Sequence, residues 1–243
     1  MNKNERVVTF SRTLAIDIGG TGIKGMILDE SGNPISDRHA IPTPHPGTPK
    51  AVLKVIYDLA QVQGTFDRLS VGFPGVVKSG VVCTAVNLDS MWHNFDLACA
   101  LTEHFGKPVF VVNDADIQGL GAIVGNGLEL VITLGTGFGS ALFHNGILIP
   151  NLEIAHHFFE EGKTYEQCLG KAALELSGKD CWNAYLQKAI VTLESMFHYD
   201  CLYIGGGHTA HINFELPPNV KIVPNVAGIL GGIALWRKSM IER

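Results

Sequence analysis

The sequence predicts an α/β protein of two lobes, each built around a glycine-rich turn that joins two apolar strands. Of its 243 residues, 46% are hydrophobic and 17% are charged, which suits a folded chain with one large domain or two small lobes. An apolar strand, a Gly-Gly-Thr-Gly turn and a second apolar strand occupy residues 13–28. The same pattern returns in residues 130–143 around a Gly-Thr-Gly turn. This echo predicts a duplicated sheet.

The first lobe is expected to continue from its hairpin through a helix to further strands. Thr48 stands before Pro49, an arrangement typical of an N-cap followed by the first helical position, and an amphipathic stretch follows in residues 51–60. The other expected elements are, in order, a strand, a small hairpin, a helix capped by Asp96 and a second strand: residues 68–73, 76–82, 96–104 and 109–112.

The second lobe is expected to be largely helical outside its sheet. Its expected elements are, in order, a helix, the second hairpin, a long helical stretch, a strand and a last helix: residues 117–124, 130–143, 164–197, 202–204 and 226–240. Gly205-Gly206-Gly207 follow the strand. We therefore expect residues 1–112 to form the first lobe, joined by a C-terminal helix 226–243, and residues 113–225 to form the second.

Composition and charge argue against several classes of partner. The formal net charge is −5 and no dense run of Lys and Arg occurs, so neither nucleic acid nor an anionic membrane is an expected partner. The five cysteines form no CxxC or CxC pair of the kind that binds zinc, and we expect reduced, mostly packed thiols. No signal peptide and no bilayer-spanning apolar segment is recognisable, which makes the cytoplasm the expected compartment.

The glycine turns are the first candidate site, because glycine lets several backbone N–H groups point at one phosphate. Residues 20–25 also match the dinucleotide pattern GxGxxG, but the chain continues as a strand where that motif requires a helix, and the sequence contains no P-loop. A lone turn of this kind is more often only a tight hairpin, whereas two matching turns favour phosphate binding. The expected phosphate-donor contacts are Gly19, Gly20, Thr21, Gly135, Thr136, Gly137, Gly205 and Gly206.

Two charged side chains flank the first turn. Asp17 stands in an otherwise apolar strand, where an unpaired carboxylate would be costly to bury. Holding the water shell of Mg²⁺ would explain this residue, and so would hydrogen bonds to the amides of the turn. Lys24 would place an ammonium beside a bound phosphate, or it would point to solvent from its strand. Both alternatives stay open for each residue.

Polar residues gather where the strand at residues 109–112 meets the next helix. A phosphoryl acceptor needs a carboxylate that takes its proton and neutral groups that fix it, and Asn113-Asp114 supply both. Either residue would also serve as the N-cap, but a cap needs only one residue, so we interpret Asp114 as functional. Glu153 and His156 have the spacing of one face of a helical turn, from which they would hold sugar hydroxyls. Alone, that spacing is a weak signal.

Four motifs in combination resemble the ROK (repressor, open reading frame, kinase) family. They are Asp17-Ile18-Gly19-Gly20-Thr21, Asn113-Asp114-Ala115-Asp116, Leu134-Gly135-Thr136-Gly137-Phe138-Gly139-Ser140 and Glu153-x-x-His156. Within the family, residues 22–25, 41–44, 73–77 and 146–151 are similar to those of the bacterial polyphosphate glucokinases. The resemblance runs from about Leu14 to the C-terminal helix.

The resemblance implies the actin-like ATPase (ribonuclease H-like) fold, a duplicated two-lobed sugar kinase. It implies a hexose, with glucose first, held in the cleft by Asn113, Asp114, Glu153, His156 and a third glutamate, for which Glu166 is preferred over Glu160 and Glu161. Asp114 would deprotonate the C6 hydroxyl, and the donor would lie across the glycine turns with Mg²⁺, which Asp17 would hold through water. Family habit also implies a homodimer.

The sequence departs from the family at three points, of which the first is the diverged segment after His157 that should carry the third glutamate. Ala155 stands between Glu153 and His156 where family members usually have glycine, so the local backbone geometry is in question. The cysteine cluster that binds zinc in many members is missing, so no structural zinc is expected.

The donor stays open between polyphosphate, ATP and both. Adenosine would lie near residues 205–207, so a bulky side chain at Gly206 is expected to impair ATP use selectively, and Lys24→Ala to impair polyphosphate use more.

The alternatives to a glucokinase are an ATP-dependent kinase for fructose, N-acetylmannosamine or another hexose, a non-catalytic sugar sensor and an actin-like assembly protein. Asp114 argues against the sensor, and Glu153 with His156 argues against the assembly protein. A DNA-binding repressor is not expected, since only about a dozen residues precede the first strand.

Overall fold

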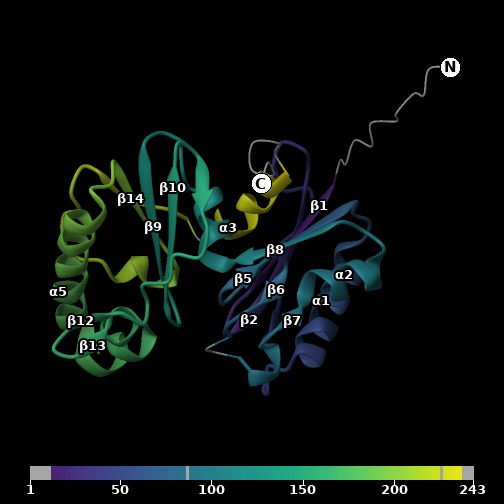
Figure 1. The fold of residues 1–243 in the computed structure, drawn as a ribbon, viewed down its shortest axis with the longest axis horizontal. Coiled ribbons are helices and arrows are strands. Elements are labelled where there is room, and N and C mark those ends of the chain that lie inside the picture. Colours follow the sequence, from purple (N-terminus) through teal and green to yellow (C-terminus); the bar gives the residue numbers. More distant parts are fainter. Residues whose placement is uncertain (1–11, 86–87, 225–226, 237–243) are drawn as a thin grey trace.

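The computed structural model describes residues 12–85, 88–224 and 227–236, which fold into two lobes that lie side by side (Figure 1). Each lobe contains one five-stranded sheet with helices packed against it. In Figure 1 the first lobe, in purple and blue, lies on the right, and the second, in teal and green, on the left. The chain passes from the first sheet to the second through α3 (Asp114–Leu120).

The first sheet has the strand order β3-β2-β1-β4-β8. Its strands are β1 (Thr13–Ile18), β2 (Gly22–Leu28), β3 (His39–Pro42), β4 (Arg68–Phe73) and β8 (Val109–Asn113). β1 pairs antiparallel with β2 and parallel with β4, and β4 pairs parallel with β8. Because side chains alternate along β1, Leu14 and Ile16 pack in the core with α1 (Pro49–Gln63) and α2 (Leu97–Phe105), while Ala15 faces the opposite side.

The capping signals of the first lobe form as predicted. The Thr48 hydroxyl accepts the Ala51 N–H at 3.3 Å, and the Asp96 carboxylate accepts the Cys99 N–H at 2.8 Å. The predicted small hairpin becomes part of a three-stranded sheet of β5 (Val77–Lys78), β6 (Val81–Val82) and β7 (Phe95–Asp96), beside the short helix η1 (Ser90–Trp92).

The second sheet repeats the topology of the first. Its order is β11-β10-β9-β14-β15, formed by β9 (Leu128–Leu134), β10 (Phe138–His144), β11 (Ile147–Ile149), β14 (Cys201–Gly205) and β15 (Val220–Ile222). An antiparallel hairpin, β9 with β10, again lies beside two parallel pairings, β9 with β14 and β14 with β15. The prediction of a duplicated sheet is therefore confirmed.

The predicted helical stretch at residues 164–197 is interrupted. It follows a two-stranded hairpin, β12 (Phe158–Glu160) with β13 (Lys163–Thr164), and divides into α4 (Tyr165–Leu169) and α5 (Lys171–Phe197). Gly170 separates the two helices with an extended backbone (φ −72°, ψ 175°), and Gly178 (φ 77°) breaks the helical geometry inside α5. A short helix, η2 (Gly207–His211), follows β14.

The last described segment returns to the first lobe. It consists of α6 (Ala227–Leu230) and η3 (Gly231–Trp236), and Ile229 and Ile233 pack against Ala15, Met26 and Leu28 of the first sheet. Gly231 touches α3 so closely that an added Cβ would lie 1.8 Å from the Ile117 carbonyl oxygen. The two lobes therefore meet where this segment crosses α3.

Two predicted helices have other bounds in the structure. The helix predicted at residues 117–124 begins at Asp114 and ends at Leu120, because the buried Glu129 carboxylate accepts the N–H groups of residues 124–126 and holds them in a loop. The last predicted helix is α-helical only over residues 227–230 and continues as a 3₁₀ helix to 236. The rest of that predicted helix, residues 226 and 237–243, lies outside the described residues.

Two sequence-based expectations concern exposure and membranes. Of the five cysteines, which are all unpaired, Cys168 is buried but Cys99 and Cys181 are exposed, so the prediction of mostly packed thiols was wrong for these two. Within the part of the chain that the structure describes, no helix has the length and apolarity needed to span a bilayer.

Candidate active site

A cavity of about 530 Å³ lies between the two lobes, and its lining includes one glycine turn from each lobe. The turns face each other closely, because an added Cβ at Gly20 would lie 3.6 Å from the Thr136 side chain. Fourteen predicted site residues line this cleft: Asp17, Gly19, Gly20, Thr21, Lys24, Asn113, Asp114, Gly135, Thr136, Gly137, Glu153, His156, Glu166 and Gly206. Gly205 is the exception, since it packs against the Gln118 amide beneath the lining.

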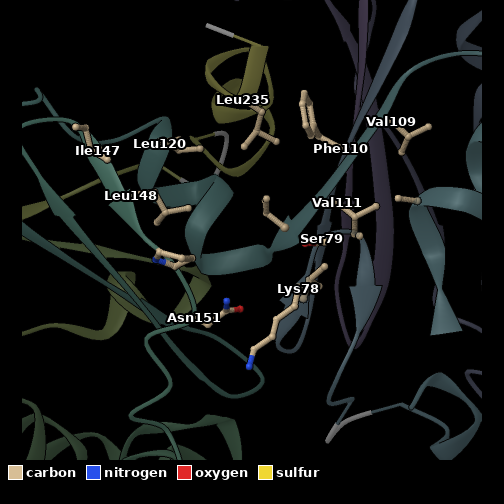
Figure 2. Close-up of a pocket in the computed structure, with 15 residues that line it drawn as sticks. Lys78, Ser79, Val109, Phe110, Val111, Leu120, Ile147, Leu148, Asn151 and Leu235 are labelled. Carbon is tan, nitrogen blue, oxygen red and sulfur yellow. The ribbon is translucent and has the colours of Figure 1, made fainter. Parts of the chain in front are cut away.

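A second cavity, of about 590 Å³, lies between the edge strands β8 and β11 (Figure 2). Apolar side chains such as Val111, Leu148 and Leu235 form most of its wall, and Lys78 and Asn151 lie at one end. None of the described residues that line it carries a carboxylate. Sugars and magnesium phosphates need several polar contacts, so the cleft with the glycine turns is the better candidate for chemistry although it is smaller.

Asn113 caps α3 and thereby settles which of the two neighbouring residues serves the helix. Its side-chain oxygen accepts the N–H groups of Ala115 at 2.8 Å and Asp116 at 3.3 Å. Its amide nitrogen donates to the Glu153 carboxylate at 3.1 Å and to the Gly75 carbonyl at 3.1 Å. Asn113 therefore ties the end of β8 to the loop that carries Glu153, and Asp114 is free of the capping role.

Asp114 is the first residue of α3 and lies at the floor of the cleft. Its carboxylate accepts the Ala115 N–H at 2.8 Å. Burial, followed by the nearby negative charge of Asp17, raises the pKa of Asp114 to about 8. A carboxyl with a pKa near neutrality, between the two turns, has the properties of a general base.

Asp116 is a second perturbed carboxyl behind the cleft. It is only 2% exposed, and burial raises its pKa to about 7, opposed by a hydrogen bond from the Asn151 backbone N–H. It does not line the cleft, and one of its oxygens has no hydrogen-bond partner among the described residues. Its contact with Asn151 links α3 to the start of the loop that leads to Glu153.

Glu153 and His156 line the cleft from a loop, so the prediction that they share a helical turn was wrong. Residues 154–157 form a single turn, in which the His157 N–H donates to the Ile154 carbonyl at 3.1 Å. Residues 151–154 before it have no regular secondary structure. Burial is the main cause that raises the pKa of Glu153, with the Glu166 charge adding to it and His156 opposing it. The three side chains therefore interact within one corner of the cleft.

Glu166, on α4, is the glutamate that the structure brings to this corner. Its carboxylate accepts the Phe138 N–H at 3.3 Å, and its own N–H donates to the Ala155 carbonyl at 2.9 Å. Glu160 instead forms an ion pair with Lys188, and Glu161 is exposed; neither lines the cleft. Ala155 is 4% exposed and packs in the core of the second lobe, so its methyl group is accommodated.

Asp17 and Lys24 occupy facing positions of β1 and β2, and the Lys24 ammonium lies 3.1 Å from the Asp17 carboxylate. Asp17 is thus paired with a lysine rather than with the amides of the turn. Asp17 is also close enough to Asp114 to raise its pKa. Mg²⁺ binds one or two carboxylates together with water and substrate phosphates. The Asp17 carboxylate, which lies beside the turns, fits that set of ligands. The described residues contain no cluster of three metal-binding side chains.

Sequence reasoning missed several residues that line the cleft. The polar ones include Arg38, Thr84, Gln118, Lys171 and His208. His208 follows the run Gly205-Gly206-Gly207, whereas the other four stand outside the glycine motifs, and no spacing pattern connects the five. Only the fold brings them to one cavity.

Comparison with known proteins agrees with this architecture. A family model described as the ROK family matches residues 13–156. The polyphosphate glucokinase of Mycobacterium tuberculosis (strain ATCC 25618 / H37Rv) is 37% identical over 236 residues, which cover 89% of this chain and 88% of that protein. The structure of an inorganic polyphosphate/ATP-glucomannokinase from Arthrobacter sp. strain KM has a TM-score of 0.83 and 36% identity, over 93% of this chain and 100% of the other.

A more distant structure shows the fold alone. The ROK family glucokinase from Streptomyces griseus, in complex with glucose and AMPPNP, has a TM-score of 0.74 at 21% identity, over 92% of this chain and 98% of the other. With the duplicated sheet, these neighbours confirm the predicted actin-like sugar kinase fold. Because the family model matches more than half of the chain and the mycobacterial relative aligns with most of it, this chain belongs to the ROK family.

Proposed function

We propose that this protein transfers a phosphoryl group from polyphosphate, ATP or both to the C6 hydroxyl of a hexose, with glucose as the first acceptor. The observation that carries the proposal is the position of Asp114. Its carboxylate lies at the floor of one cleft, with Glu153, His156 and Glu166 in one corner and both glycine turns on the walls. Relatives named polyphosphate glucokinase and polyphosphate/ATP-glucomannokinase support the same reaction.

The residues divide the work according to their chemistry. Asp114 takes the proton of the attacking hydroxyl, which its raised pKa suits. Asn113, Glu153, His156 and Glu166 accept from or donate to the other sugar hydroxyls and fix the angle of attack. Backbone N–H groups of the turns hold the donor phosphates, and when bound, Mg²⁺ supplies positive charge there, with Asp17 holding it through water. The transition state is loose, so alignment contributes most of the acceleration.

A coupled assay of the purified protein tests this function. Glucose 6-phosphate formation is measured with polyphosphate and with ATP in turn, and then with fructose, mannose and N-acetylmannosamine in place of glucose. We expect turnover of glucose with at least one donor. Sugar binding without turnover with either donor would favour the sensor, and turnover of another hexose alone would favour that kinase. A homodimer, a cytoplasmic location and the two-lobe boundaries stay predictions.

The two glycines after β14 separate the donors experimentally. Gly206 has φ +94°, and an added Cβ would lie 2.2 Å from the Leu134 carbonyl oxygen, whereas an added Cβ at Gly207 meets no described atom within 4 Å. The earlier expectation that a bulky residue at Gly206 impairs ATP use alone was therefore wrong, because the backbone itself would shift. We expect Gly206→Val to impair both donors and Gly207→Leu, which projects into the cleft, to raise the KM for ATP selectively.

Steady-state kinetics with each donor at saturating glucose measure this difference. Thermal unfolding of both variants is the control, since only Gly206→Val should lower the melting temperature. Equal increases in KM for ATP and polyphosphate in Gly207→Leu would mean that adenosine does not bind beside this glycine.

A further inference from the structure

Besides His156, basic side chains line the cleft in two pairs on opposite lobes. Lys24 on β2 and Arg38, which directly precedes β3, belong to the first lobe. Lys171 at the start of α5 and His208 in η2 belong to the second. β2 and β3 are paired strands, and Lys171 is close enough to His208 to lower its pKa, so each pair is local.

These side chains are weakly engaged within the protein. Arg38 forms no ion pair with any residue that the structure describes. Lys171 lies 3.6 Å from Glu175, but both side chains are more than half exposed, and such pairs contribute little. Lys24 is the exception, since Asp17 holds it at 3.1 Å. The cleft therefore keeps positive charge available for an anion.

One ring nitrogen of His208 lacks a hydrogen-bond partner among the described residues. This atom, Nδ1, is buried. Burial, followed by the charges of His211 and Lys171, lowers the pKa of His208, and Glu175 alone opposes them. Because His208 lines the cleft, a phosphate oxygen bound there would accept an N–H of this imidazole.

We propose that the donor phosphates beyond the transferred one lie between these two pairs of side chains. A polyphosphate chain is then bound from both lobes, by Lys24, Arg38, Lys171 and His208. This inference rests on the proposed function. We call the four side chains the phosphate track. ATP has three phosphates and would place adenosine beside Gly207, so it would leave part of this track unused. A longer polyphosphate chain fills it, and each added contact between a phosphate and a cation strengthens binding.

The track predicts a dependence on chain length. With the wild-type protein, the Kd for polyphosphate should fall from tripolyphosphate to long chains and rise with ionic strength, because salt screens the contacts near the cleft mouth. Arg38→Ala and Lys171→Ala should each weaken long-chain binding by about tenfold and remove most of the length advantage. Neither should change the KM for glucose, and Arg38→Ala should alter the KM for ATP much less than that for polyphosphate.

His208 adds a pH signature that a merely structural role would not produce. Phosphate favours the charged imidazole, so polyphosphate should bind the wild-type protein more tightly as pH falls below 6.5, the ordinary pKa of histidine from which that of His208 is lowered. His208→Gln keeps a hydrogen-bond donor but cannot become charged, and it should lose this tightening. The groups that face His208, namely His211, Lys171 and Glu175, remain unchanged in that variant.

Binding is measured directly, by calorimetry with polyphosphate of defined length in the absence of glucose, and turnover is measured in parallel. Lys54→Ala is the matched control, because Lys54 pairs with Asp58 on the surface of α1, outside the cleft, and its loss changes the net charge equally. The proposed polyphosphate site would be wrong, and the proposed function unaffected, if three variants bound polyphosphate like the wild type while the protein still phosphorylated glucose. These variants are Arg38→Ala, Lys171→Ala and His208→Gln. No turnover by the wild-type protein would overturn the proposed function instead.

Discussion

Asp114→Asn is expected to lower kcat with glucose by about 10²–10⁴-fold, the range typical for loss of a general base. The amide has the same shape as the carboxylate and its oxygen can still accept the Ala115 N–H, so the start of α3 should be retained. It cannot take the proton of the C6 hydroxyl. The measurement is kcat with saturating glucose and donor, together with glucose affinity by calorimetry, which should change little.

The same substitution has an opposite effect on stability, which serves as its control. The pKa of Asp114 is raised from 3.8 to about 8, so the folded protein binds this proton more tightly than the unfolded chain. The stabilising contribution of this group is present at low pH and is lost as pH rises between those two values. Asp114→Asn should therefore have a higher melting temperature than the wild type near pH 8, and the difference should shrink towards pH 4. A variant that turns over glucose at nearly the wild-type rate would exclude Asp114 as the base.

Glu153→Ala and His156→Ala are expected to weaken glucose use by about 1.5–3 kcal/mol each, the usual value of a hydrogen bond that involves a charged group. The effect should appear in kcat/KM for glucose, with the KM for the donor nearly unchanged. Glu153→Ala should be the more severe, because Glu153 also accepts the Asn113 amide at 3.1 Å and so helps to position the cap of α3.

Two variants separate sugar contact from general damage. Glu153→Gln retains an acceptor for Asn113 and should recover part of the loss. Glu161→Ala removes an exposed carboxylate outside the cleft and should behave as the wild type. If both alanine variants keep the wild-type KM for glucose, neither residue belongs to the sugar site.

The fold was predictable where local signals are strong. Hairpins with glycine turns, the cap at Thr48 and the apolar run at residues 68–73 all depend on neighbours in the sequence. Six strands, β3, β7, β11, β12, β13 and β15, were not predicted. They are short, and β3 and β11 are mostly exposed edges, so neither length nor alternation distinguishes them from loops.

The site was predictable from its motifs but not in its local geometry. The loop with Glu153 resembles a helical turn in spacing, yet it is fixed by Ser140 on β10, whose hydroxyl donates to the Leu152 carbonyl and accepts the Ile154 N–H. Asn151 also has φ +62°, which starts the loop outside helical geometry. Such long-range hydrogen bonds leave no signal in the sequence. Arg38, Lys171 and His208 were missed because residues far apart in the sequence come together only in the folded cleft.

The packing of the last described segment against the first sheet also bears on protein synthesis. Ala15, Met26 and Leu28 are covered by Ile229 and Ile233, which leave the ribosome long after the strands they cover. Domains generally fold as the chain emerges, beginning at the N-terminal end. Here one face of the first sheet stays open while the whole second lobe is being translated. The nascent chain therefore carries an exposed apolar surface that a chaperone can hold until Ile233 arrives.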